Sequence, residues 1–457
     1  MAWKGLETFL AELEGQGDLH RIPVEVSPEL ELAEITDRIS ALPGGGPALL
    51  FEKITGSRYP AAANTFGSAS RMAAALGIDC LDDLSLIMEK ILVRTSPPPA
   101  LLLAIDHPAC REVVERIPDL TGLPLLRGWP VDGTAAGGRY LTLPLVITAD
   151  PVTGELNCGI YRVEVLGPDR AVIGWHPGSD GERHFRQHTA AGKRMPVAIA
   201  LGGPPQLILA ASFSLPGLPD EFSFAGLLSG APVEVTRCLT SDCIVPAAAE
   251  VVIEGYLESG ETATEGPFGN HTGYYAPPRQ APLFRVTAIT RRQNPLIPLT
   301  IVGPPPQEDC WLAKAGERLM LPWMRQQFPG VVSLFFPMET IFHRCAMVSV
   351  DRSRSGDVTS LLRRLRESGP LRCSKVIIVT DADTRLDPAT VWWRTINSCN
   401  WQKDLSISAD GMSLDIDATR KPERGEPLER REAAELVDRR WQEYGWEPPG
   451  TAKTQRA

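Results

Sequence analysis

Hydrophobic positions near the start of the chain recur with the period of an α-helix. Four apolar residues follow the i, i+3, i+4, i+7 spacing and predict an amphipathic helix over residues 3–14: Leu6, Phe9, Leu10 and Leu13. Before residue 94 the pattern also predicts helices over 29–39 and 81–93 and strands over 20–26 and 48–52. We therefore expect an N-terminal α/β domain at residues 1–124, in which the last helix ends at the linker Pro97-Pro98-Pro99.

The pattern changes near residue 125, where short strand-like runs begin to follow one another closely. Turn residues such as Asp150-Pro151 and Gly202-Gly203 separate these runs. We predict strands over residues 140–148, 159–166, 172–175, 197–201, 207–211, 233–239, 249–257, 283–290 and 297–302. Dense short strands with this spacing are typical of a β-barrel or of two orthogonal sheets. We place this central domain at residues 125–305.

Helical periodicity returns after residue 305. We predict a helix over 309–328 that is interrupted at Pro322, and then a strand, a helix and a strand over 346–350, 357–368 and 375–380. These elements define a C-terminal α/β domain at 306–424. In the remaining segment, 425–457, an amphipathic helix is predicted over 428–444, with Ala433, Leu436, Val437, Trp441 and Tyr444 on its apolar face. Such a helix packs either on a neighbouring subunit or on its own domain.

Composition excludes several classes of protein. The 457 residues have a formal net charge of −10 and 43% hydrophobic residues, which is typical of a soluble globular protein and not of a general nucleic-acid binder. No apolar run approaches the roughly 20 residues that span a bilayer, so we expect no integral membrane segment. The start of the chain lacks the apolar region of a signal peptide, and we expect a cytoplasmic protein. The nine cysteines include no CxxC pair, and we expect reduced, mostly buried thiols.

The first stretch with candidate chemistry is the turn at residues 264–275. It contains Gly266, Gly269 and Gly273 together with Pro267, which favour a backbone path that bulky residues cannot follow. A strand-like run precedes it, so a rigid element can deliver Glu265 into a cleft. The alternative is a tight surface turn with a solvated glutamate.

The second stretch runs from the turn at Asp150 into the strand that carries Asn157 and Arg162. In a regular strand these two side chains lie on opposite faces, because their separation is odd. Gly159, between them, permits a bulge or the close approach of a ligand to the backbone. An arginine beside Glu265 orients that carboxylate and binds an anionic substrate. The alternative is an exposed salt bridge at the end of a strand.

Together the two stretches, Asn157–Arg162 and Glu265–Gly269, resemble the UbiD family of prenylated-flavin-dependent decarboxylases. Other collinear similarities extend the resemblance almost from end to end, at residues 17–19, 46–52, 200–202, 221–226, 414–415 and 417–419. The most similar branch decarboxylates polyprenyl-hydroxybenzoate in ubiquinone synthesis. The resemblance implies a central split-barrel domain that holds prenylated FMN, between an N-terminal and a C-terminal α/β domain.

The resemblance also implies a reaction and its partners. In this family the modified flavin forms an adduct with an aromatic or α,β-unsaturated carboxylic acid and acts as an electron sink while CO2 leaves. The cofactors implied are prenylated FMN, a divalent Mn²⁺ or Mg²⁺ ion, and K⁺ as a further candidate. A flavin prenyltransferase supplies the cofactor, and the chain self-associates as a dimer or hexamer through its terminal helix.

The family's site residues are carried over by position. The resemblance makes Arg162 and Glu265 members of the catalytic network. It places Thr142, Gly159, Ile160 and Tyr161 beside the flavin. Asn157 and Glu221 match two ligands of the metal that binds the flavin phosphate, and oxygen ligands of this kind suit Mg²⁺ or Mn²⁺.

Two positions depart from the family pattern. The second catalytic acid of the family is here Asn270, whose amide cannot donate and retrieve a proton, so that Glu265, His271 or water must do so. The third metal ligand, a histidine in the family, is here Gly178, and His176 is the nearest substitute.

Two functions follow from this combination. The first is a prenylated-FMN-dependent non-oxidative decarboxylase, or a reversible carboxylase, of an aromatic or conjugated acid. The alternative is a non-catalytic flavin-binding or structural subunit of a multi-component carboxylase, which Asn270 and Gly178 favour. We expect His184 and His188 to be surface residues outside the cleft.

Overall fold

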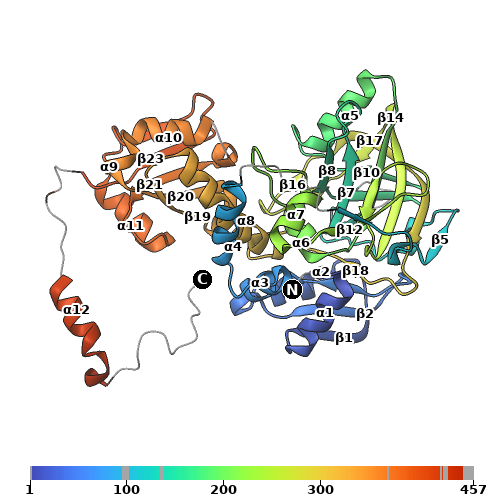
Figure 1. Ribbon diagram of the computed structural model, residues 1–457, viewed down its shortest axis with the longest axis horizontal. Helices are drawn as coiled ribbons and strands as arrows, with labels where there is room; N and C mark the ends of the chain where they lie inside the picture. Colours follow the sequence, from blue (N-terminus) through green and yellow to red (C-terminus); the bar gives the residue numbers. More distant parts are fainter. Residues whose placement is uncertain are drawn as a thin grey trace. The chain divides into compact units, whose positions relative to one another are not determined.

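A computed structural model describes residues 3–94, 102–133, 138–367, 370–421, 425 and 431–445 (Figure 1). Their contacts divide the chain into two compact units. Unit 1 comprises Met1–Gln327 with Met338–Phe342, and unit 2 comprises Phe328–Pro337 with His343–Ala457. The finer division at residues 124, 305 and 424 stays a prediction, and the predicted linker at Pro97–Pro99 lies outside the described residues.

Unit 1 begins with the predicted α/β pattern. Its helices are α1 (Leu6–Gly15), α2 (Glu31–Ser40), α3 (Ala69–Leu76) and α4 (Asp83–Leu92). A four-stranded sheet has the order β1 (Leu19–Val26), β2 (Ala48–Ile54), β3 (Ala61–Ala63) and β18 (Ile297–Pro298). The apolar face of α1 is buried as its periodicity predicts, whereas α3 was not predicted.

A nine-stranded sheet forms the centre of unit 1, and most of its strands pair antiparallel. Its strands are β5 (Val113–Glu115), β6 (Tyr140–Leu141), β7 (Pro144–Ala149), β8 (Leu156–Ile160), β9 (Val163–Gly167), β10 (Arg170–Ile173), β11 (Met195–Leu201), β14 (Val251–Glu265) and β17 (Arg279–Arg291). The order is β6-β9-β10-β17-β14-β11-β7-β8, with β5 also on β17. Closure into the split barrel that the resemblance implies stays a prediction.

The longest pair in this sheet, β14 with β17, ends at the candidate turn. Its register shifts between Glu254 and Gly255 and again between Leu257 and Thr262. Gly255 is required there, because a Cβ atom would lie 2.1 Å from the carbonyl oxygen of Arg285. The shifts bring the last residue of β14, Glu265, opposite Arg279.

Shorter elements complete the central part of unit 1. They are the helices α5 (Asp180–Ala190), α6 (Pro205–Ala211) and α7 (Glu221–Ser229), and the strands β4 (Leu102–Ala104), β12 (Val233–Arg237), β13 (Ile244–Pro246), β15 (Phe268–Gly269) and β16 (Tyr275–Ala276). The predicted strand at 207–211 is wrong, because this run is helix α6. A continuous apolar run fits a buried helix as well as a strand, and Pro205 sits in the first helical turn, where proline favours a helix.

The predicted strand at 159–166 is broken in two. β8 ends at Ile160 and β9 begins at Val163, so Tyr161 and Arg162 lie between the strands. Asn157 and Arg162 therefore do not belong to one regular strand, and the argument that their side chains lie on opposite faces does not apply. Arg162 lies outside the sheet.

Helix α8 (Glu308–Gln327) continues through Pro322, and the predicted interruption is wrong. Proline has no N–H to donate to the carbonyl four residues earlier, which belongs to Arg318. The hydroxyl of Ser85 on α4 donates to that carbonyl oxygen instead, at 2.9 Å. Packing on a neighbouring helix thus replaces the lost bond.

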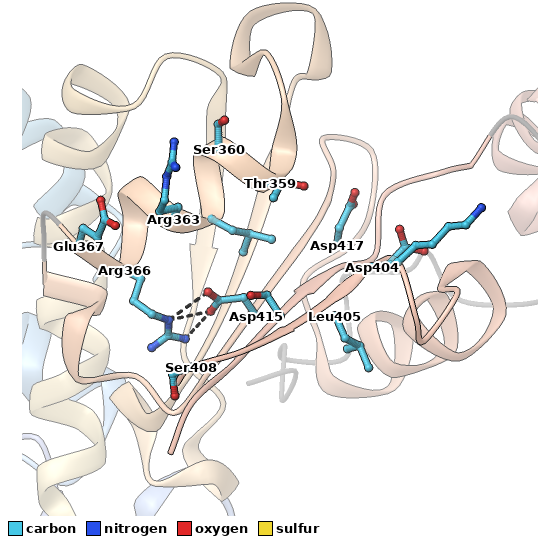
Figure 2. Close-up of a pocket in the computed structure, with 13 residues that line it drawn as sticks. Thr359, Ser360, Arg363, Arg366, Glu367, Asp404, Leu405, Ser408, Asp415 and Asp417 are labelled. Atoms are coloured by element: carbon cyan, nitrogen blue, oxygen red, sulfur yellow. Dashed lines mark hydrogen bonds and ion pairs between the residues drawn. The ribbon is translucent and has the colours of Figure 1, made fainter. Parts of the chain in front are cut away.

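Unit 2 contains the predicted β-α-β pattern in a five-stranded sheet. In the order of the sheet the strands are β19 (Val331–Phe335), β20 (Cys345–Val350), β21 (Val376–Asp381), β23 (Leu414–Asp417) and β22 (Leu405–Ile407), and the helices are α9 (Arg352–Ser355), α10 (Val358–Glu367) and α11 (Pro388–Ser398). Figure 2 shows Arg366 of α10 bound to Asp415 of β23, with Nε 2.9 Å from Oδ1, beside a pocket of about 490 Å³. This pair ties the helix to the sheet.

The predicted terminal helix is present as α12 (Arg431–Arg439), followed by a 3₁₀ turn at Trp441–Tyr444. Its apolar residues Leu436, Val437 and Tyr444 are exposed, and its packing on a neighbouring subunit stays a prediction. No helix in the described ranges is long and apolar enough to cross a membrane. All nine cysteines are free thiols and only Cys80 and Cys373 are exposed, as predicted.

Candidate active site

Glu265 is fully buried at the end of β14, although a turn rich in glycine favours exposure. The turn that follows contains Gly266 at φ 84° and a cis peptide bond to Pro267. A buried carboxylate is stable only when it is hydrogen-bonded and paired with positive charge. The interpretation of Glu265 as a solvated surface glutamate is therefore wrong.

Arg162 supplies the first positive charge. Its Nε lies 2.7 Å from Oε1 of Glu265 and its Nη2 lies 3.0 Å from Oε2, which is the two-pronged geometry that a guanidinium and a carboxylate prefer. The side chain of Arg162 is 18% exposed and that of Glu265 is 1% exposed, so the pair is not an exposed salt bridge at a strand end. Gly174 leaves room for it, since a Cβ there would lie 2.9 Å from Cγ of Arg162.

A second arginine, which the sequence analysis did not identify, completes the network. Arg279 is the cross-strand partner of Glu265, so their side chains share one face of the sheet. Its Nε lies 3.2 Å from Oε2 of Glu265, and its Nη2 donates to the carbonyl oxygen of Trp175 at 2.7 Å. The only sequence signal for Arg279 was the hairpin of β14 and β17. The register of that hairpin depends on two shifts that no sequence pattern predicts.

Aromatic rings form one wall beside the ion pair. The guanidinium carbon of Arg162 lies 4.6 Å from the ring centre of Phe268, within the range of a cation–π contact. Tyr140 stands edge-on to Phe268 with ring centres 4.7 Å apart. The hydroxyl of Tyr140 donates to Glu164, which also accepts from the backbone N–H of Gly266 at 2.8 Å. Arg162 is thus fixed on its face as well as at its nitrogens.

Asn270, which we predict to replace the second acid of the family, lies at the far end of the same turn. Its Oδ1 accepts from the backbone N–H of Thr272 at 2.8 Å and from the hydroxyl of the same residue. The amide therefore stabilises the local turn, as asparagine commonly does. The ring of the next residue, His271, lies 5.5 Å from that of Phe342.

Asn157 belongs to a buried polar network on β8. Its Nδ2 donates to the hydroxyl of Thr148 at 3.1 Å, and that oxygen lies 3.0 Å from Nδ1 of His184. His184 and His188 are buried on α5, so the expectation that they are surface residues is wrong. Burial, followed by the charge of Arg183, lowers the pKa of His184. The error arose because α5 was not predicted, and its inward face was unknown.

Glu221 begins α7 and faces the same strand. Its Oε2 accepts from the backbone N–H of Cys158 at 2.8 Å. Burial raises the pKa of Glu221 to about 7, and the nearby carboxylates of Asp220 and Asp180 add to this rise. Glu221 is thus a carboxylate whose charge its surroundings disfavour.

Two of the residues predicted to line the flavin, Gly159 and Tyr161, contact each other. The ring of Tyr161 covers Gly159, where a Cβ would lie only 2.3 Å from the ring, and it stands edge-on to Trp175 with ring centres 4.8 Å apart. The glycine therefore makes room for a side chain of the protein. Thr142 is buried and its hydroxyl accepts from the backbone N–H of Thr300 at 3.0 Å. Ile160 ends β8 beside them, and the contacts of these residues with a flavin stay a prediction.

His176 lies beside the arginines. Although part of the surface of His176 is exposed, the surrounding protein disfavours its charged form. This effect lowers the pKa of His176, and so do the charges of Arg162 and Arg279. Two guanidinium groups also disfavour a metal cation at this position. Within the ranges that the structure describes, no three His, Cys, Asp or Glu side chains are grouped to hold a metal. The set Asn157, Glu221 and His176 stays a prediction.

The geometry predicts unequal contributions of the two arginines to stability. Arg162→Gln leaves Glu265 buried with one partner and should lower the free energy of unfolding by about 3 kcal/mol. Arg279→Gln should cost only about 1 kcal/mol, because its side chain is 37% exposed and solvent screens its charge. Denaturant titration of both variants measures the difference. Equal losses would contradict the assignment of Arg162 as the main partner.

Comparisons with known proteins match most of the chain. Family models described as the N-terminal, Rift-related and C-terminal domains of 3-octaprenyl-4-hydroxybenzoate carboxy-lyase match residues 10–91, 103–305 and 310–426. A protein of Aquifex aeolicus is 38% identical over 424 residues, which cover 89% of this chain and 86% of the relative. A protein of Archaeoglobus fulgidus is 36% identical over 427 residues, with the same shares.

Solved structures are similar over nearly the entire chain. Vanillic acid decarboxylase of Sedimentibacter hydroxybenzoicus, in its closed form, has a TM-score of 0.87 at 27% identity and covers 98% of this chain and 100% of its own. An evolved dimeric form of the UbiD-class enzyme HmfF of Pelotomaculum thermopropionicum, in complex with prFMN, has a TM-score of 0.83 at 29% identity and covers 95% and 98%. Because these family models cover most of the chain and relatives are more than 30% identical over 89% of it, the chain belongs to the UbiD family.

Proposed function

We propose that this carboxy-lyase of the UbiD family removes CO2 from an aromatic or α,β-unsaturated carboxylic acid, with prenylated FMN as cofactor. The observation that carries the proposal is the buried network of Glu265 with Arg162 and Arg279. The relatives that support it are a vanillic acid decarboxylase and the enzyme HmfF, of which structures with prFMN and with FMN are known. If the reaction runs in reverse, the same site adds CO2 to the product.

The two arginines bind the substrate carboxylate. A guanidinium carries five N–H donors, more than the bonds to Glu265 and to the carbonyl of Trp175 consume. Both arginines are partly exposed, whereas Glu265 is buried behind them, so an incoming carboxylate meets donors first. Their fixed planes orient the carboxylate so that the bond to its carbon can break.

Prenylated FMN, when bound, supplies the electron sink for the electron pair that CO2 leaves behind. Thr142 and the backbone of Gly159, Ile160 and Tyr161 are proposed to line it. Tyr161 is buried by its own contacts with Gly159 and Trp175, which makes this wall rigid before any ligand binds. The protein's part is to hold the acid against that wall and to exclude water from it.

A proton must then replace CO2 on the substrate carbon. We assign its transfer to Glu265, because Asn270 has no titratable proton and its amide is engaged by Thr272. In this assignment the ionised Glu265 first takes a proton from water and then passes it to the substrate carbon, while Arg162 and Arg279 orient its carboxyl group. His271 and water remain the alternatives for a proton path on the Asn270 side.

A divalent metal ion is proposed at Asn157 and Glu221. Both offer oxygen atoms beside β8, and burial together with Asp220 and Asp180 raises the pKa of Glu221, so a bound cation would stabilise its charged form. Mg²⁺ or Mn²⁺ suits such ligands. His176, the third ligand in the sequence prediction, is left out of this set because Arg162 and Arg279 disfavour a cation beside it. K⁺ would require further oxygen ligands of the same kind.

The alternative is a non-catalytic flavin-binding or structural subunit of a larger carboxylase. It is not favoured, because Arg162 and Glu265 retain a buried geometry that a purely structural subunit does not need. We further propose a homo-oligomer, dimer or hexamer, a cytoplasmic location, and a flavin prenyltransferase as the source of the cofactor. The dimeric form of HmfF supports the first of these.

The function is tested by replacing Glu265. Purified protein is reconstituted with prenylated FMN and incubated with a panel of aromatic and conjugated acids, while CO2 release and deuterium uptake from D2O are measured. Glu265→Gln should lower the rate by at least about 100-fold, since it removes acid–base catalysis. The control Glu258→Gln, exposed on the same strand, should leave it unchanged. Equal rates for wild type and Glu265→Gln would contradict the proposal.

Restoring an acid at position 270 tests whether proton supply limits the reaction. Asn270→Asp keeps an oxygen for the Thr272 turn and adds a titratable group, so the fold should be unaffected. We expect the rate of deuterium incorporation to rise several-fold. An unchanged or lower rate would show that the site uses another proton path.

Metal binding is tested through the pH dependence of thermal stability after treatment with a chelator. In the metal-free protein the pKa of Glu221 is raised from 4.5 to about 7, so protonation of Glu221 stabilises the fold. This stabilisation is complete below pH about 4.5 and is lost as the pH rises through about 7. Mn²⁺ should therefore raise the Tm more at pH 8 than at pH 6, because it replaces the lost proton. Glu221→Gln should abolish the effect of Mn²⁺, and Glu258→Gln should not. A pH-independent Mn²⁺ effect that persists in Glu221→Gln would exclude this site.

A further inference from the structure

A second buried carboxylate, Asp132, lies beneath the turn that joins Glu265 to Asn270. Asp132 is 2% exposed. Its Oδ1 accepts from the backbone N–H of Gly269 at 2.7 Å, and its Oδ2 accepts from the backbone N–H of Trp129 at 2.9 Å. One carboxylate thus joins the candidate turn to a segment more than a hundred residues earlier in the chain.

The segment around Asp132 contacts the turn at further points. The backbone N–H of Gly133 donates to the carbonyl oxygen of Pro267 at 2.6 Å. The ring of Trp129 lies directly against Gly269, where a Cβ would be 2.2 Å from Cδ1 of the ring. The ring is itself held, because its Nε1 donates to the carbonyl of Val302 at 2.8 Å. The held ring of Trp129 therefore restricts the position of Gly269.

The two ends of the turn rest on two different acids. Gly266, the residue after Glu265, donates its N–H to Glu164, and Gly269, the residue before Asn270, donates its N–H to Asp132. Both acceptors are buried. The positions of Glu265 and of residue 270 are thus set by backbone bonds to carboxylates that lie below the site.

A buried carboxylate costs more free energy than an apolar side chain of similar size unless its hydrogen bonds are satisfied. Burial raises the pKa of Asp132, and the N–H groups of Gly269, Trp129 and Gly128 act in the opposite direction, as does the charge of Arg127. An apolar residue would fill the space at lower cost, so this carboxylate has a use other than packing.

We propose that Asp132 is a positioning residue: by fixing the amide of Gly269 it holds the turn that carries Phe268, the ring on which the guanidinium of Arg162 rests. This inference rests on the proposed function for its effect on rate, but not for its effect on the turn. Only a carboxylate meets the requirement, because it offers an acceptor on each oxygen. An asparagine would turn an NH2 group toward the N–H of either Gly269 or Trp129.

The variant Asp132→Asn tests the inference, with Asp169→Asn as control, since Asp169 is an exposed aspartate that faces Arg170. We expect Asp132→Asn to lower kcat about 10- to 100-fold, because a displacement of about 1 Å has effects of that size. The KM should change less than about threefold, because Arg162 and Arg279 still bind the carboxylate. Hydrogen exchange of peptides covering residues 266–272 should become faster. The control should change none of these three quantities.

Hydrogen exchange on the wild type alone provides a second test, which needs no variant to fold. The amide of Gly269 should exchange as slowly as amides in the centre of β17. Fast exchange there, or an Asp132→Asn variant with unchanged kcat and unchanged exchange, would overturn the inference. If the wild type decarboxylates no acid while Asp132→Asn still loosens the turn, the proposed function fails and the positioning role of Asp132 stands.

Discussion

The burial of one carboxylate, Glu265, is the constraint on which the rest of the site depends. Its charge is stable in the interior because Arg162 binds both oxygens and Arg279 binds one of them. These groups come together because the chain leaves the sheet between β8 and β9 and because the register between β14 and β17 shifts twice. Irregular backbone that would weaken an ordinary sheet is here the means by which three charged side chains meet.

Two carboxylates of the same protein are kept in opposite environments. Glu265 lies between two guanidinium groups, whereas Glu221 lies near other acids and has a pKa raised to about 7 by burial. Environment of this kind commonly divides roles between acids of one site. In the proposed function Glu265 transfers a proton to the substrate, and Glu221 binds a metal cation. The two are attached to opposite ends of one segment, since Cys158 binds Glu221 and Arg162 binds Glu265.

The two positions that we predict to depart from the family pattern both lie in turns of the backbone. The side chain of Asn270 stabilises its turn through Thr272. Gly178 has φ 78° and its N–H donates to Glu182. In the proposed function, proton transfer therefore depends on Glu265, whose turn is held by Glu164 and Asp132.

The sequence by itself determined the features that depend on local pattern. These are the α/β class, the buried face of α1 and the family motifs, since periodicity and motif spacing are properties of neighbouring residues. The pairing of Arg162 with Glu265, 103 residues apart, was expected only from the family resemblance. Tertiary structure decided what depends on distant partners. Ser85 allows α8 to pass Pro322, and burial makes residues 207–210 a helix although a strand fits the same pattern. Arg279 reaches Glu265 through a register that only the folded sheet defines, because each bulge shifts which residues face each other.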